Sequence, residues 1–147
     1  MNSPKVKLTL AGVVSIALLA GCSGSSDSGV DVASLAGNYR VTLNNVLYPT
    51  SSPTQYYSGT MKVTAARAVT IDMDVPWSDL SGSINDQGCV TVTGNTLNGV
   101  YQGDDTWTGC ITGSGTDKKV TNGKWTFQFQ NGPIAEEKWT AQCTQGC

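Results

Sequence analysis

Apolar and polar residues alternate with a period of two along most of the chain after residue 35. Within each segment one set of alternate positions is apolar and the other is rich in threonine, which is typical of antiparallel strands with one face in a core and one in water. Strands are predicted at residues 39–43, 61–65, 69–73, 90–93, 107–112 and 125–130. No segment of ten or more residues has the apolar period of an amphipathic helix, and residues 30–35 can form at most one turn.

Turn residues separate these segments, for example at Asn85-Asp86-Gln87-Gly88, Gly113-Ser114-Gly115 and Asn131-Gly132-Pro133. Small residues followed by glycine also fall inside predicted strands, where glycine often marks the bulge or tight bend that a strongly curved sheet needs. These pairs end at Gly59, Gly82, Gly94 and Gly109. The pattern predicts an all-β domain over residues 35–147, a small antiparallel up-and-down barrel or sandwich of about eight strands.

The up-and-down pattern and the opening Gly37-Asn38-Tyr39 resemble the lipocalin- and avidin-like barrels. The sequence contains no ligand motif of either family, so no binding residue is carried over from them. Trp107, Trp125 and Trp139 are in phase with other apolar residues and are predicted to lie in the core.

The N-terminal segment has a different pattern. Lys5 and Lys7 precede a short apolar run, residues 8–19, and small residues then lead to Cys22. A helix of this length rises about 18 Å, too little for the ~30 Å hydrocarbon core of a bilayer. Residues 1–21 are therefore predicted to be a secretory signal peptide.

The residues Leu19-Ala20-Gly21-Cys22 resemble a bacterial lipobox. The resemblance implies cleavage before Cys22, diacylglycerol on its thiol and a further acyl chain such as palmitate on the new amine, which together anchor a protein to a membrane. In that family an aspartate after the cysteine favours retention at the inner membrane, so Ser23 indicates the outer membrane. Residues 22–34 begin with a Gly/Ser-rich run and are predicted to be a flexible tether.

Charge and composition exclude several classes of function. The chain has no histidine, which removes Ser-His-Asp and Cys-His catalysis and histidine-ligated zinc or haem. Loss of residues 1–21 would leave 7 cationic against 11 acidic side chains, a net charge of −4. A nucleic-acid-binding protein should carry a basic face, so no nucleic-acid partner is expected. No cofactor or metal site is expected either.

Four cysteines remain once Cys22 is lipidated, an even number that predicts two disulfides in an exported protein. Cys89–Cys110 with Cys143–Cys147 is preferred, and the pairings 89–143 with 110–147 and 89–147 with 110–143 stay open. Cys89 and Cys110 fall opposite each other if their strands are neighbours, with residues 94–105 as an excursion. If residues 96–101 instead form a strand between them, the two cysteines are about 9–10 Å apart and cannot bond.

Acidic side chains are the main candidates for chemistry. Asp72 and Asp74 would share one face of a strand, about 6.5–7 Å apart, a spacing that glycoside hydrolysis can use. That face is polar, so we interpret it as solvated. Asp104-Asp105 is predicted to lie in a turn with too few oxygen ligands for calcium, and Lys118-Lys119 in another turn. No serine lies in a Gly-x-Ser-x-Gly motif, so the chain is not expected to be an enzyme.

Aromatic residues near proline-containing loops are candidates for ligand contact, namely Tyr56, Tyr57 and Trp77. The sequence predicts a lipid-anchored β-domain of the cell envelope with a non-enzymatic binding or structural role, whose partner is an unknown protein or saccharide. One alternative is an envelope inhibitor or safeguard protein, because some lysozyme inhibitors are small lipidated β-barrels. The other is a small hydrolase that uses Asp72 and Asp74. A filled barrel interior would favour binding at the surface over transport of a small ligand.

Overall fold

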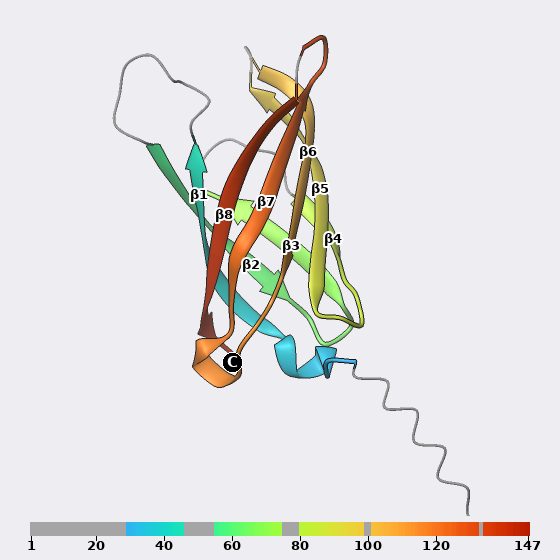
Figure 1. The fold of residues 1–147 in the computed structure, drawn as a ribbon, viewed down its shortest axis with the longest axis vertical. Coiled ribbons are helices and arrows are strands. Elements are labelled where there is room, and N and C mark those ends of the chain that lie inside the picture. Colours follow the sequence, from blue (N-terminus) through green and yellow to red (C-terminus); the bar gives the residue numbers. More distant parts are fainter. Residues whose placement is uncertain (1–28, 46–54, 75–79, 99–100, 133) are drawn as a thin grey trace, which may run out of the picture.

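The computed structural model describes residues 29–45, 55–74, 80–98, 101–132 and 134–147, without the side chains of residues 45, 55, 96–98 and 101. Eight antiparallel strands follow one another around a closed barrel, and the last strand pairs with the first (Figure 1). The strands are β1 (Gly37–Asn45), β2 (Gln55–Val63), β3 (Ala68–Met73), β4 (Leu80–Ile84), β5 (Cys89–Asn98), β6 (Tyr101–Cys110), β7 (Lys119–Phe129) and β8 (Ile134–Gln145). The prediction of an all-β meander is confirmed, and of its two architectures the barrel is the right one.

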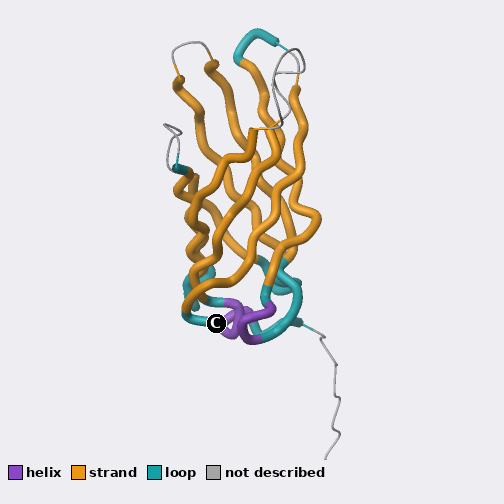
Figure 2. Tube along the Cα trace, turned by 90° about the vertical axis from the view of Figure 1, so that its left-hand side faces the viewer, coloured by secondary structure: helices purple, strands orange, loops and turns teal. Residues whose placement is uncertain are grey.

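The two helices of the described residues are single turns of 3-10 type, η1 (Val32–Leu35) and η2 (Gly115–Asp117). Asp31 caps η1 by accepting a hydrogen bond from the backbone N–H of Ala33. Val32 and Leu35 are buried in the core cluster, so η1 packs against the core; we call it the η1 plug. Figure 2 shows both helices at the same end of the barrel as the C-terminus; we call this the helix end and the opposite one the distal end.

Large side chains fill the barrel interior, as the alternating pattern predicts. Tyr39, Trp107, Trp125 and Trp139 are at most 1% exposed. The ring of Trp107 lies 6.2 Å from that of Trp125 and 5.6 Å from that of Trp139, between centroids, within the range of favourable aromatic pairs. The prediction that these three tryptophans form the core is confirmed.

Strands β5 and β6 form one long hairpin, which corrects both interpretations of residues 94–105. Their register runs without a break from Cys89 opposite Cys110 to Asn98 opposite Tyr101. The segment is neither an excursion nor a separate central strand, but the second half of β5 and the first half of β6. The disulfide and the regular meander are therefore compatible.

Both preferred disulfides are present. Cys89 bonds Cys110 across the start of the hairpin, with Cα atoms 3.8 Å apart. Cys143 bonds Cys147 just beyond the end of β8. The two open alternatives, which would have crossed between these pairs, are wrong.

The strand glycines predicted to mark bulges do lie inside strands, but the register passes through Gly59, Gly82, Gly94 and Gly109 without a shift. Gly59, Gly82 and Gly109 instead allow close approach of neighbouring strands. A Cβ on Gly82 would lie 2.7 Å from Cα of Val92. The register shifts fall elsewhere, between Asn38 and Tyr39 and between Val120 and Gly123.

The strands have unequal lengths, and this gives the barrel two different halves. β3 and β4 have 6 and 5 residues, whereas β5 to β8 have 10 to 12. On the distal side, the last pair between β1 and β8 is Leu43 with Trp139. Beyond that point β5 to β8 continue as one wall and β1 with β2 as another, while the helix half is closed all round.

Candidate functional site

Among the described residues, the core side chains of the closed half of the barrel present no accessible surface to a ligand. Tyr39, Val41, Trp107 and Trp139 are all 0% exposed there. Two hollows lie instead on the outer face of β7, β8 and β1. Contact with another molecule is therefore best sought on the barrel surface and at its distal end.

The distal end carries exposed apolar and aromatic side chains. Tyr56 on β2 is 66% exposed and Ile134 at the start of β8 is 59% exposed. Tyr57, next along β2, is half-buried and packs against the core cluster together with Phe129. Of the three predicted contact residues, Tyr56 is thus freely accessible and Tyr57 partly so, while Trp77 lies outside the described residues.

Ile134 was not among the predicted contact residues, although its position in the alternating pattern indicated an outward-facing side chain. Along β8 the exposed positions include Glu136, Lys138 and Thr140, and Ile134 shares their phase. An isoleucine in phase with charged residues is expected on the outer face.

Asp105 occupies an interior position that was predicted to be a turn. The residue lies within β6, is 1% exposed, and its Oδ1 accepts a hydrogen bond of 2.6 Å from Nε1 of Trp125. Charged side chains are almost never fully buried unless they are paired, so this contact holds two strands together inside the barrel. Asp105 lies two residues before Trp107, so the alternating pattern placed it on the inward face, which the turn interpretation overlooked. Asp104, at the alternate position, is exposed.

The other acidic candidates are solvated. Asp72 lies on β3 and Asp74 directly after it, and both are exposed, as predicted for a polar face. Neither lines either of the two hollows, so the geometry gives no support to a hydrolase. Within the described ranges, no group of three or more Cys, Asp or Glu side chains could hold a metal ion.

Lys118 is not the surface turn residue that its sequence position predicted. It is 4% exposed, and its Nζ donates a hydrogen bond to the backbone carbonyl of Ser34 in η1. Lys119, its neighbour, is exposed at the start of β7. The buried Lys118 side chain therefore links η1 to the segment that enters β7.

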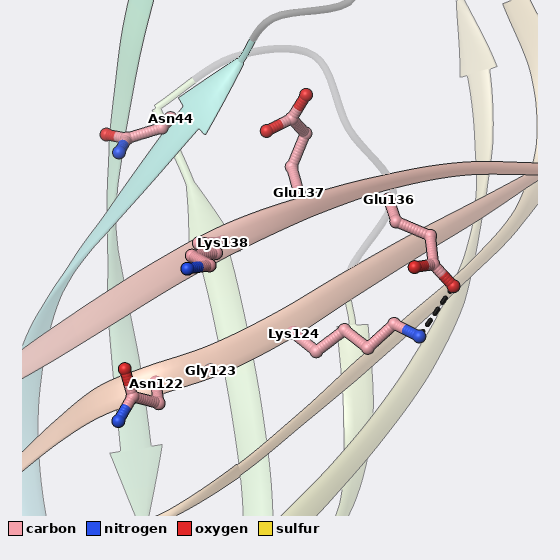
Figure 3. A pocket seen from close by; sticks show the side chains of 7 residues that line it. All are labelled: Asn44, Asn122, Gly123, Lys124, Glu136, Glu137 and Lys138. Atoms are coloured by element: carbon pink, nitrogen blue, oxygen red, sulfur yellow. Dashed lines mark ion pairs between the residues drawn. The ribbon is translucent and has the colours of Figure 1, made fainter.

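The two hollows follow each other along β8. One, of about 520 Å³, is lined by Asn44, Asn122, Gly123, Lys124, Glu136, Glu137 and Lys138 (Figure 3). The other, of about 330 Å³, includes Arg40, Thr42, Lys119, Thr140 and Gln142. Four cations, Arg40, Lys119, Lys124 and Lys138, thus line hollows on three adjacent strands. We call them the cationic face.

Comparison of the chain with protein-family models, with curated proteins and with solved structures finds no match. None of the helices in the described residues is long and apolar enough to cross a membrane. Any functional conclusion therefore rests on the motif at Cys22 and on the geometry of the barrel.

Proposed function

We propose that the chain is a lipid-anchored, non-enzymatic binding protein of the bacterial cell envelope. In this proposal Cys22 carries the lipid, residues up to about the start of η1 act as the tether, and the barrel presents a binding surface to a saccharide or a protein. The outer membrane is the proposed location, from the resemblance of Leu19-Ala20-Gly21-Cys22 to a lipobox and from Ser23.

The observation that carries the proposal is the difference between the two barrel ends. The described chain enters the barrel at the helix end, next to η1 (Figure 2). Both disulfides lie in the same half. The exposed Tyr56 lies at the opposite end. A tether attached at the helix end would leave the distal end and the walls of the barrel free to meet a partner.

The filled interior supports surface binding rather than transport. A barrel that carries a small ligand needs an enclosed space, and the indoles of Trp107, Trp125 and Trp139 occupy the centre of this one. No described residue favours an inhibitor of lysozyme over other binding roles. The geometry best supports a rigid scaffold that contacts its partner through its outer surface.

Fractionation of the full-length protein in bacteria tests the anchor. Wild type should incorporate labelled palmitate and remain with the outer membrane. Cys22→Ser should lose the label and leave the membrane fraction or remain unprocessed, whereas Ser25→Ala, in the tether, should behave like wild type. If Cys22→Ser fractionates with membranes as well as wild type, the proposed anchor is wrong.

Photo-crosslinking in the intact envelope tests which end of the barrel binds. A photoreactive amino acid at position 56 should capture a discrete envelope component, whereas the same group at Gln87, an exposed residue of the helix end, should capture little. Equal capture at the two positions, or capture only at position 87, would contradict binding away from the tether.

A further inference from the structure

The cationic face concentrates charge on one side of an acidic chain. Of the nine Lys and Arg residues, seven lie beyond Cys22, and four of these are Arg40, Lys119, Lys124 and Lys138. Glu136 and Glu137 of β8 line the larger hollow beside these cations, whereas Asp72 and Asp104 lie on other strands, β3 and β6. Four cations against two carboxylates leave the face with a positive charge, opposite in sign to the net charge of the chain.

Strand register sets the spacing of the cations near the helix end. Gln142 of β8 lies directly opposite Arg40 of β1 on one side and Lys119 of β7 on the other. All three are exposed, so they lie in one row across three strands. Two strand spacings place the backbones of Arg40 and Lys119 about 10 Å apart.

The second pair of cations lies farther along the same strands. Lys124 of β7 is directly opposite Lys138 of β8. Like charges in directly opposed positions destabilise a sheet, so this arrangement has a cost that an anion bound between them would relieve. Lys138 is four residues from Gln142, which separates the two rows by about 13 Å.

Acidic side chains compensate this charge only in part. Lys124 forms an ion pair of 2.5 Å with Glu136, and both side chains are more than half exposed. Glu137 also lines the larger hollow, but Figure 3 shows its carboxylate pointing away from Lys124 and Lys138. With the described residues, Arg40, Lys119 and Lys138 make no ion pair.

The surface between the cations is concave and hydrogen-bonding. Hollows of about 520 and 330 Å³ contain the amides of Asn44 and Asn122 and the hydroxyls of Thr42 and Thr140. A flat bilayer would not fill these hollows, and no exposed apolar side chain lines them to insert into lipid. No aromatic side chain lines them either, as stacking of nucleic-acid bases would need.

We propose that the cationic face binds an anionic polysaccharide of the envelope along β8. Carboxylate or phosphate groups of the polymer would lie at the row of Arg40 and Lys119 and at the row of Lys124 and Lys138. Sugar hydroxyls would meet the threonine and amide side chains between them. The location of this polymer rests on the proposed function, but the binding chemistry does not, since it depends on the barrel wall alone.

Binding of the full-length lipoprotein in neutral detergent to alginate, a carboxylated polysaccharide, tests the proposal. The protein should bind alginate and not dextran, which is uncharged, and binding should weaken with added salt. Arg40→Gln and Lys138→Gln should each weaken binding about threefold, and the double variant about tenfold, as expected for partly exposed charge pairs. Arg67→Gln, which removes an exposed cation in the turn between β2 and β3, away from β7 and β8, is the control and should bind like wild type.

Other outcomes would overturn the inference. Equal binding of dextran, or an equal effect of Arg67→Gln, would exclude recognition by the cationic face. Binding to phosphatidylglycerol vesicles without binding to alginate or to a phosphorylated polysaccharide would assign this face to a membrane surface instead. Failure of the Cys22 anchor test with intact alginate binding would refute only the proposed location, and the reverse result would refute only this inference.

Discussion

The two ends of the barrel are built in different ways. At the helix end the connections bond to one another: the N–H of Val30 donates to the carbonyl of Asp86, and that of Ile111 donates to the carbonyl of Gly88. A plug, two disulfides and the buried Lys118 add to these contacts. At the distal end the strands separate into two walls, and Tyr56 and Ile134 are exposed.

This difference separates stability from recognition. The helix half buries its side chains and links its loops covalently, so substitutions there should mainly change the free energy of unfolding. The distal end and the outer walls contribute few buried contacts, so substitutions there should mainly change binding. Removing one side chain from each half and measuring the free energy of unfolding of the domain tests this difference.

The largest effect is expected where the barrel closes. Trp139 is 0% exposed, pairs with Leu43 at the last β1–β8 contact, and its Nε1 donates to the carbonyls of Thr108 and Lys124. Trp139→Ala should lower the free energy of unfolding by about 3–5 kcal/mol, because it removes the packing and leaves a cavity. Tyr56→Ala should change it by less than about 0.5 kcal/mol. Urea unfolding followed by circular dichroism measures both, and equal losses would contradict the division into two halves.

The disulfide across the β5–β6 hairpin should come next. The cysteines are 21 residues apart, and Cys89→Ala should cost about 3 kcal/mol in the chain-entropy account. Cys147→Ala opens a bond between residues only 4 apart and should cost about 2 kcal/mol. Thiol titration and peptide mapping without reduction should find one free thiol, at Cys110, in the first variant. A mixed disulfide between Cys110 and Cys143 would show that the two pairs are not independent.

High pH should weaken the attachment of the η1 plug. Burial removes the Tyr39 phenol from water and raises its pKa to about 12, and the hydroxyl donates a hydrogen bond of 2.6 Å to the carbonyl of Leu35. The unfolded state loses this proton near pH 10, so the stabilisation is complete below pH 10 and is lost between about pH 10 and 12. The loss should reach about 2.7 kcal/mol. Tyr39→Phe, measured in the same urea titrations, should remove this part of the pH dependence; an unchanged slope would exclude Tyr39 as its source.

The smallest of these effects concerns the buried carboxylate of β6. Asp105→Ala should lower the free energy of unfolding by about 1–3 kcal/mol, because Nε1 of Trp125 loses its acceptor inside the barrel. Asp104→Ala, one residue away on the outer face, should have an effect within about 0.5 kcal/mol. Trp fluorescence should shift only in the Asp105 variant. Equal effects of the two substitutions would show that the hydrogen bond contributes little.

Much of the local structure could be predicted because burial on a strand repeats every two residues. The strand around Tyr39, the three core tryptophans and the solvated Asp72 all follow from that period. The opposition of Cys89 and Cys110 followed from the same reasoning once their strands were taken as neighbours. Predictions were wrong where the apolar signal is weak: residues 94–105 are mostly polar, and Asp105 and Lys118 are charged residues in buried positions.

The sequence by itself located six of the eight strands, with their inward and outward faces, and the turns at the helix end, and it predicted the signal-like segment that precedes Cys22. Only the tertiary structure decided that the sheet closes as a barrel, because β1 and β8 come from opposite ends of the domain and no local pattern records their pairing. It also decided that Lys118 is buried and bonded to η1, that Arg40 and Lys119 flank Gln142, and that Lys124 lies opposite Lys138. The physical reason is that alternation reports the surroundings of each residue along one strand, whereas closure and the cationic face depend on which distant strands become neighbours.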